Sequence, residues 1–261
     1  MEKIATFNVN GIRARLAPLL AWLDGEPGIQ ILALQEIKAR EEDFPFPFFE
    51  ERGFTVSCQG EKSFNGVAII SRIPPDDLVR GLPGREHLGA RFIAARFANL
   101  WILNSYVPQG RSAADPMFTE KLRFIEAIGD YIQSRHQPGD ALIWLGDINV
   151  APHDIDVYDP VKLKGQVGFH PEEQAALGEV MDKCRLYDLF RTKNPRARQF
   201  SFWDYRAPNG FKRDLGWRID HFLVSKPVLE HCTACWIAKD LRGEDKPSDH
   251  VPVLASFSGS F

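Results

Sequence analysis

Residues 142–149 read LIWLGDIN, an apolar run that ends abruptly in polar residues. Four apolar residues followed by glycine and aspartate are typical of a buried strand that ends at a turn. The pattern recurs at residues 4–8, 31–36 and 100–106, where IATFN, ILALQE and LWILNSY also pass from apolar to polar side chains. Because polar residues at the ends of several buried strands tend to converge at one rim, the sequence predicts a functional site there.

Neighbouring strands in this chain leave little room for crossover helices. Residues 54–71 and 92–106 each hold two predicted strands in succession. A parallel connection needs a dozen or more residues, usually as a helix. We therefore expect an α/β fold with mixed, partly antiparallel sheets rather than a doubly wound parallel sheet.

Three helices are predicted between these strands. Asp115 and Pro116 provide an N-cap and a first helical position, and apolar residues then recur at helical spacing until QPG at 137–139. A second helix starts at Pro171, and an N-terminal helix covers about 11–23.

Length and composition point to one ordinary globular domain over residues 1–261, because no repeat or low-complexity linker divides the chain. The net charge of −3 argues against binding nucleic acid through indiscriminate basic charge, but a groove needs only local Lys and Arg. No secretory signal or apolar run of about 20 residues is visible, so we expect no membrane partner and a cytoplasmic location. The pair Cys232 and Cys235 lacks a second Cys/His pair at zinc-finger spacing, which favours core packing over a zinc or redox site.

Glu36 follows a predicted strand and is either a surface or capping carboxylate or a ligand for a hard cation. Mg²⁺ favours sites with one or two carboxylates that leave positions for water and phosphate. Asn8 and Asp249 could complete such a sparse shell.

Asp147 and Asn149 are two residues apart, which in an extended chain puts both side chains on the same side. One interpretation is a turn stabilised by Asx side chains. In the other, Asp147 positions or deprotonates a water molecule, while Asn149 donates a hydrogen bond to phosphate without repelling it.

His250 follows Ser248 and Asp249 just before a final predicted strand, where a solvated turn is one interpretation. The alternative is an imidazolium that stabilises charge on a phosphorane, held by a buried carboxylate. Asp220 is the expected partner, because an aspartate in the middle of the apolar strand 218–224 needs one to tolerate burial.

Residues 203–217 mix basic and aromatic side chains. They form either a solvated hairpin over a buried aromatic cluster or a loop that faces DNA, with Arg and Lys on phosphates and an apolar pocket for a sugar turned out of the helix.

Seven segments together resemble the exonuclease III-type apurinic/apyrimidinic endonucleases, in the order found in that family and over essentially the whole chain. They are TFNVNGIR at 6–13, LQEIK at 34–38, NGVA at 65–68, YVPQG at 106–110, GDIN at 146–149, WRID at 217–220 and PSDH at 247–250. The resemblance implies a DNase I-like four-layer α/β sandwich, with two mixed sheets packed face to face, helices outside and the active site at one edge.

The resemblance also implies roles for individual residues. Glu36, Asn8 and Asp249 match the residues that surround Mg²⁺ or Mn²⁺, and Asp147 matches the residue that orients or activates water. The matches that contact phosphate are Asn149, Tyr106 and His250, with Asp220 orienting His250. The predicted substrate-binding residues are Phe202, Trp217 and Ile219, which line a pocket for an abasic deoxyribose, together with Gln109, Arg111 and Arg213.

The implied activity is DNA repair by metal-dependent hydrolysis of the phosphodiester 5′ to an abasic site, leaving a 3′-hydroxyl and a 5′-deoxyribose phosphate. Removal of 3′-blocking phosphates or diesters and 3′→5′ exonuclease activity are expected as well. The expected partner is double-stranded DNA with abasic sites or blocked 3′ ends, bound by a monomer. Asn10 stands where some relatives have an aspartate, which disfavours a second tight metal site.

Two other functions are compatible with the sequence. The broader fold also serves phosphatases and phosphodiesterases of other substrate classes, such as inositol polyphosphates, sphingomyelin and RNA tails. A non-catalytic DNA-binding module is the other alternative, and it would bind without turnover.

Overall fold

Two six-stranded sheets form the centre of the computed structural model, which describes residues 2–137 and 139–259. The first has the order β11-β12-β1-β2-β4-β3 and the second β5-β6-β7-β8-β10-β9. The strands of the first sheet are β1 Glu2–Asn8, β2 Ile29–Gln35, β3 Thr55–Gln59, β4 Val67–Ser71, β11 Cys232–Ile237 and β12 Val253–Phe257. Those of the second are β5 Asp77–Arg80, β6 Phe92–Phe97, β7 Leu100–Tyr106, β8 Ala141–Asp147, β9 Tyr187–Asp188 and β10 Asp220–Val224.

Both sheets are mixed, as the sequence predicts. The pairs β1/β2 and β7/β8 are parallel, and the other described pairs are antiparallel. The two segments without room for a crossover helix form the antiparallel pairs β3/β4 and β6/β7.

The helices lie outside the sheets. They are α1 Ile12–Gly25, α2 Phe46–Glu50, α3 Pro116–Arg135, α4 Pro160–Leu163, α5 Pro171–Cys184, α6 Leu189–Lys193 and α7 Lys226–His231, with short 3₁₀ turns at Glu41–Asp43, Glu86–Leu88, Asp154–Asp156 and Lys239–Gly243. The three predicted helices correspond to α1, α3 and α5. Asp115 caps α3 as expected, because its Oδ1 accepts a hydrogen bond from the Met117 amide at 2.9 Å.

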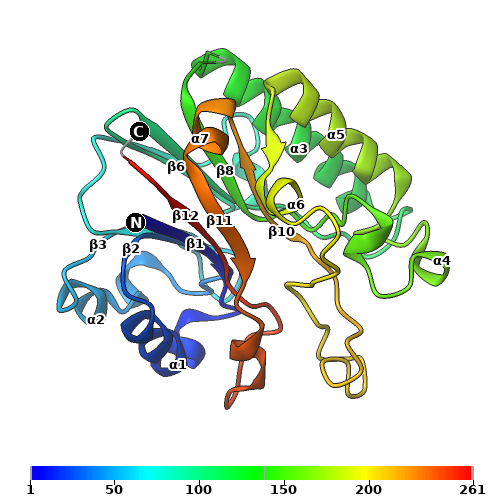
Figure 1. The fold of residues 1–261 in the computed structure, drawn as a ribbon, viewed down its shortest axis with the longest axis horizontal. Helices are drawn as coiled ribbons and strands as arrows, with labels where there is room; N and C mark the ends of the chain where they lie inside the picture. The colour runs from blue at the N-terminus through cyan, green and yellow to red at the C-terminus, as the bar shows by residue number, and fades with distance from the viewer. Residues whose placement is uncertain (1, 138, 260–261) are drawn as a thin grey trace.

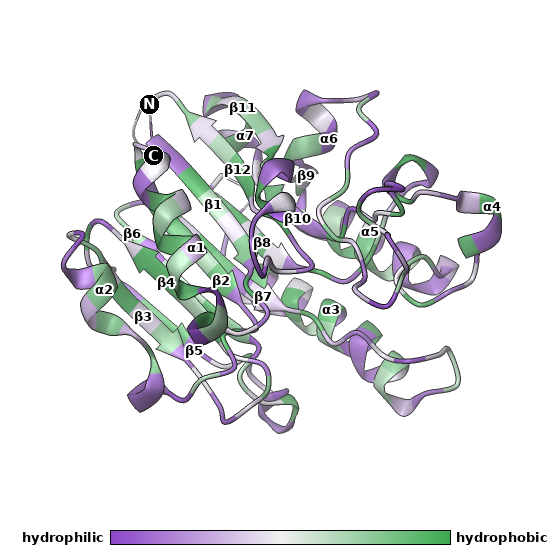
Figure 2. Cartoon of the chain, turned by 90° about the horizontal axis from the view of Figure 1, so that it is seen from below, coloured by the Kyte–Doolittle hydropathy of each residue, from purple (hydrophilic) through white to green (hydrophobic). Residues whose placement is uncertain are grey.

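Alternating side chains along the strands build the layers. One set of strand residues, such as Ile69 and Ile143, packs between the two sheets. The opposite face of the first sheet packs on α1 and α2, and that of the second on α3 and α5. Figure 1 shows these helix pairs on opposite sides of the sheets, and Figure 2 shows apolar residues concentrated along the strands. The four-layer α/β sandwich is therefore confirmed.

Strand direction brings the polar strand ends to one edge. Asn8 is paired with Gln35 at the ends of β1 and β2, and Tyr106 with Asp147 at the ends of β7 and β8. Antiparallel β10 begins at the same edge, where Asp220 pairs with Asp147. The predicted rim of polar residues thus forms from both sheets.

Two further features concern the chain away from this edge. Cys232 and Cys235 are buried free thiols of β11 that pack in the core between the sheets, and burial raises the pKa of both. Among the described residues, no helix has the length and apolar character needed to cross a membrane.

Candidate active site

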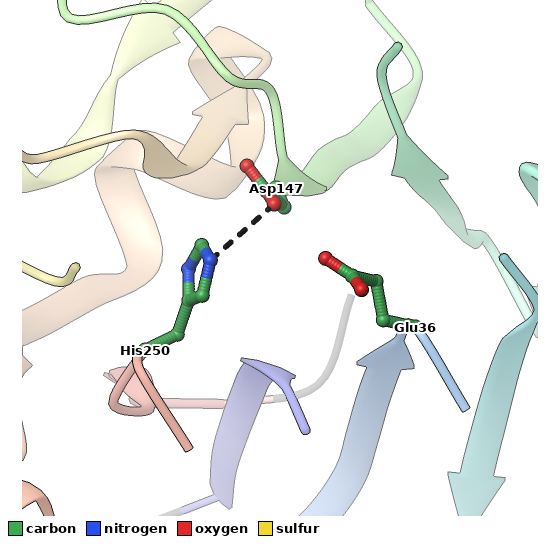
Figure 3. Close-up of side chains that lie close together, drawn as sticks. All are labelled: Glu36, Asp147 and His250. Atoms are coloured by element: carbon green, nitrogen blue, oxygen red, sulfur yellow. Dashed lines mark ion pairs between the residues drawn. The ribbon is translucent and has the colours of Figure 1, made fainter. Parts of the chain in front are cut away.

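Glu36, Asp147 and His250 meet at this edge, and each offers a ligand atom within 4.8 Å of the others. Figure 3 shows the three side chains pointing toward one another, with the His250 ring facing Asp147. The His250 Nε2 to Asp147 Oδ2 distance is 3.7 Å. The residues follow β2, end β8 and precede β12, so the cluster joins the two sheets.

Backbone constraints fix the position of Glu36. Glu36 and Lys38 both have left-handed backbone angles, with φ of 49° and 50°. The intervening Ile37 donates its amide to the Gly66 carbonyl at 3.1 Å. A Cβ on Gly66 would lie 2.4 Å from Ile37 Cγ1, and φ at Gly66 is 89°, so only glycine fits here. The NGVA segment therefore supports the Glu36 turn.

Asn8 connects the two carboxylates. Its buried Nδ2 donates to Glu36 Oε1 and to Asp147 Oδ2, both at 2.8 Å, while its Oδ1 accepts from the Asn10 amide at 3.0 Å. In this arrangement the Asn8 side chain donates hydrogen bonds to two carboxylates of the predicted metal site. Its role as a metal ligand remains a prediction.

Asp249 is linked to Glu36 through two intervening side chains. Asn10 Nδ2 donates to Asp249 Oδ1 at 2.9 Å, and Lys38 Nζ donates to Asn10 Oδ1. Lys38 Nζ also pairs with Glu36 Oε2 at 2.8 Å. Asp249 is not among the three residues whose ligand atoms cluster, so its metal role also stays a prediction.

His250 is paired with Asp220 as the sequence predicts, with Nδ1 at 2.8 Å from Oδ2. Burial alone would lower the pKa of His250, but the carboxylates of Asp220, Asp147 and Asp249 raise it to about 10. The ring is therefore an imidazolium at neutral pH. One detail of the prediction is wrong: Asp220 is the first residue of β10 rather than a mid-strand residue, since the backbone before it turns toward Phe202.

The two cluster carboxylates differ in their proton affinity. Burial raises the pKa of Asp147 to about 7 from an ordinary value of 3.8, with Asp220 and Glu36 adding to the effect and His250 opposing it. Burial tends to raise the pKa of Glu36 as well. Hydrogen bonds from Asn8 and Lys38 outweigh this effect and hold the pKa of Glu36 below its usual value.

Tyr106 lies beside these carboxylates. Burial raises the pKa of its phenol well above the usual value, and the charges of Glu36 and Asp147 raise it further. Arg91 stacks on its ring at 4.6 Å from the centroid. Tyr106 therefore stays protonated and can act as a hydrogen-bond donor.

The extended geometry predicted for residues 147–149 is wrong. Asn149 has a left-handed backbone with φ of 56°, and its amide donates to Asp147 Oδ1 at 3.0 Å. This is the Asx turn that the sequence left open, and Asn is among the few residues that tolerate such angles. The Asn149 side chain instead donates to the Val107 carbonyl at 2.9 Å and lines a cavity.

That cavity has a volume of about 660 Å³ and collects most of the predicted substrate-binding residues. Those in its lining are Gln109, Arg111, Phe202, Trp217 and Ile219. Phe202, which lines the cavity, also contacts His250, with ring centroids 4.7 Å apart, so the cavity lies next to the carboxylate cluster.

Arg213 does not line this cavity; its side chain is exposed and donates to the Pro208 carbonyl at 3.5 Å. Arg206 from the same loop lines the cavity instead, next to Asp204. Residues 165–168 form another part of the wall that the sequence analysis missed, because the GQVG sequence carries no charged or aromatic signal.

The loop 203–217 has features of both interpretations, and its contact with DNA stays a prediction. Trp203 is fully buried and packs against Phe200 and Phe211, as in a buried aromatic cluster. Trp217 is half-buried and faces the cavity.

Arg218 forms a buried ion network that the sequence analysis also missed. Its guanidinium donates to both carboxylate oxygens of Asp156, at 2.7 and 2.9 Å, and to Asp188 Oδ2 at 2.7 Å. Burial acts to raise the pKa of both aspartates, but Arg218 outweighs it and holds the pKa of each below its usual value. An arginine at the start of an apolar predicted strand is a signal that could have predicted such partners.

Arg218→Met is expected to lower the free energy of unfolding by about 3–5 kcal/mol at neutral pH, because it leaves buried carboxylates without a counter-charge. The native pKa of Asp156 and Asp188 lies below the ordinary 3.8, so the stabilisation is present above that pH and is lost as pH falls below it. Denaturant unfolding at pH 7 and at about pH 2.5, below the ordinary aspartate pKa, measures both effects. Arg96→Met, at a surface pair with Asp76, should cost less than about 1 kcal/mol; an equal loss in both variants would contradict the network's importance.

Comparison with known proteins agrees with this geometry. Residues 5–250 match the model of the Endonuclease/Exonuclease/phosphatase family. The chain belongs to this family. Exodeoxyribonuclease III of Haemophilus influenzae is 37% identical over 98% of this chain and 99% of its own length.

Solved structures of family members are similarly close. An AP endonuclease from Archaeoglobus fulgidus superimposes with a TM-score of 0.95 and 38% identity, covering 99% of this chain and all of the other. A 3′ phosphatase from Neisseria, bound to a product DNA hairpin, superimposes with a TM-score of 0.93 and 33% identity, covering 99% of this chain and all of the other. This member of the endonuclease/exonuclease/phosphatase family is therefore a hydrolytic nuclease with a DNA repair function.

Proposed function

We propose that this nuclease cuts the DNA backbone 5′ to abasic sites in duplex DNA, and that the same site removes 3′-blocking phosphates or diesters and trims 3′ ends. It acts as a monomeric single domain in the cytoplasm, with Mg²⁺ as cofactor and Mn²⁺ as a substitute. The observation that carries the proposal is the cavity lined by Asn149, Phe202, Trp217 and Ile219, which lies next to the carboxylate cluster through the contact of Phe202 with His250.

The donor set fits a hard divalent cation. Glu36 and Asp147 supply two carboxylates, the number that Mg²⁺ sites commonly use while leaving room for water and phosphate. His250 Nδ1 is paired with Asp220, and the surrounding carboxylates raise the pKa of the ring, so we assign His250 to the phosphate rather than to the metal. When bound, the cation supplies Lewis-acid neutralisation of the phosphate charge.

The chain's own residues supply the remaining chemistry. Asp147 orients the attacking water and takes a proton from it. The water oxygen bonds to phosphorus as the bond to the leaving 3′-oxygen breaks. The His250 imidazolium, the Tyr106 hydroxyl and the second N–H of the Asn149 amide are donors for the phosphate oxygens.

Rates on matched duplexes test the substrate assignment. Purified protein with Mg²⁺ receives duplexes with an abasic site, a 3′-phosphate or a clean recessed 3′ end, and inositol polyphosphates serve as the comparison. We expect the abasic duplex to be cut fastest. Faster hydrolysis of inositol phosphates would assign the protein to another branch of the family.

Trp217→Ala tests the specificity wall. Removing the indole enlarges the cavity, so cleavage at abasic sites should fall while cleavage beside normal nucleotides rises relative to it, because aromatic walls exclude a base sterically. If Trp217 only packs under the loop, its loss costs stability, about 3–5 kcal/mol at most, and depresses all activities together. Side-by-side rates on the folded variant decide between these, and an unchanged ratio would remove Trp217 from the specificity wall.

A further inference from the structure

Three successive carbonyls after the Asp147 turn each accept a hydrogen bond from a side chain of a different element. Lys121 Nζ of α3 donates to the Asn149 carbonyl at 2.7 Å. His221 Nε2 of β10 bonds the Val150 carbonyl at 2.8 Å, and Gln174 Nε2 of α5 donates to the Ala151 carbonyl at 3.1 Å. Among the described residues these carbonyls have no backbone partner, so the three side chains, together with the bond from the Ala151 amide to the Gly168 carbonyl at 2.7 Å, fix the peptide planes of the segment 149–151.

Lys121 is itself held by a buried partner. Its ammonium pairs with Glu173 Oε1, and both side chains are fully buried. Glu173 Oε2 accepts the Gly168 amide at 2.7 Å and the His170 amide at 3.1 Å. The pair therefore fixes Asn149 and the Gly168 wall of the cavity relative to each other.

His221 is oriented by Arg218. The Arg218 NH1 group lies 2.9 Å from His221 Nδ1 and can only donate, so Nδ1 must accept. A neutral ring then carries its proton on Nε2, which is the atom that donates to the Val150 carbonyl. The buried network of Asp156, Asp188 and Arg218 thus sets the tautomer that anchors the loop.

Asn149 needs such support because its left-handed backbone is uncommon for a residue other than glycine. Such backbone conformations persist when the surroundings over-determine them. The side-chain amide of Asn149 is buried, and the direction in which it points depends on the planes of the adjoining peptides.

We propose that Lys121, His221 and Gln174 are positioning residues that hold Asn149 against the reacting phosphate. They act through the backbone and do not touch the substrate. The inference rests on the proposed function only in taking Asn149 as a phosphate contact.

A double-mutant cycle tests the proposal. His221→Phe/Gln174→Ala is combined with Asn149→Gly, which removes the amide while allowing the positive φ. Single-turnover rates are measured with saturating enzyme and Mg²⁺, and DNA affinity is measured in EDTA. The expected loss for His221→Phe/Gln174→Ala is about 10-fold in rate, with affinity changed less than about 3-fold, as for a misplaced catalytic group.

The cycle separates positioning from general destabilisation. In the Asn149→Gly background the same two changes should lower the rate by less than about 2-fold, because the group they position is gone. An undiminished 10-fold loss in that background, or no loss in the native background, would overturn the proposal. Gln174→Ala alone, at a half-buried bond, provides the test if the double change does not fold.

His136→Phe is the matched control. His136 is buried at the end of α3, and neither ring nitrogen has a hydrogen-bond partner among the described residues. It lies near Leu142, at the opposite end of β8 from Asp147. The single-turnover rate of His136→Phe should stay within about 2-fold of that of the native protein, as for a site that is not coupled to the reaction.

The cycle is run on whichever phosphate substrate the native protein cleaves. If the native protein removed a 3′-phosphate but did not cut the abasic duplex, the result would count against the proposed function and leave the positioning role open to the test. A native protein that cleaves, with Asn149→Gly equally active, would contradict the positioning role.

Discussion

Asp147→Asn and His250→Ala are each expected to lower turnover on an abasic duplex by at least about 10²-fold, with DNA binding affected less. Asn keeps the size of Asp147 but cannot accept a proton from water. His250→Ala removes the ring that Asp220 holds at 2.8 Å and that we propose to contact the phosphate. Single-turnover rates and affinities in EDTA measure the two effects separately.

The surface residue His87 provides a matched control for His250. It pairs with Glu120 at 3.3 Å in an exposed position, so His87→Ala should leave turnover unchanged. Near-normal turnover of Asp147→Asn or His250→Ala would show that its assigned role is wrong.

Glu36→Gln should raise the Mg²⁺ concentration that gives half-maximal activity by at least about 10-fold. Metal affinity falls by about that factor even when a residue that only hydrogen-bonds to a metal ligand is lost. The substitution removes one of the two clustered carboxylates and keeps the side-chain length. Asp147 must lose its proton to bind a cation, and its pKa is about 7 in the metal-free site. The Mg²⁺ concentration that gives half-maximal activity of the native protein should therefore fall as pH rises through 7.

Glu26→Gln is the control, since Glu26 pairs with Lys3 away from the cluster. An unchanged Mg²⁺ titration for Glu36→Gln, with normal maximal rate, would contradict the assignment of Glu36 to the metal.

The strand pattern predicted the mixed sheets and the edge where the polar strand ends meet, because buried strands leave a strong local signal and strand direction then fixes where their ends lie. Asn8, Tyr106 and Asp147 are examples, since each ends a strand. The four-layer sandwich itself came from the resemblance to the exonuclease III-type endonucleases. The pairing of His250 with Asp220 was predictable for a similar reason, because a buried aspartate needs a partner.

Other features depend on contacts between distant segments and have no local signal. The Asx turn at 147–149 was one of two interpretations of the sequence, but the side chains that bond the carbonyls of residues 149–151, Lys121, Gln174 and His221, lie on three different elements and gave no signal. The exclusion of Arg213 from the cavity in favour of Arg206 depends on how the loop 203–217 folds over Trp203. Tertiary packing, rather than composition, decides which basic residue lines the cavity.

Cleavage of a duplex with one abasic site, with Mg²⁺ and with EDTA, tests the central claim most directly. We predict incision 5′ to the abasic site with Mg²⁺, giving a 3′-hydroxyl and a 5′-deoxyribose phosphate, and no incision in EDTA while binding persists. Binding without incision in either Mg²⁺ or Mn²⁺ would contradict the account and indicate a non-catalytic DNA-binding module.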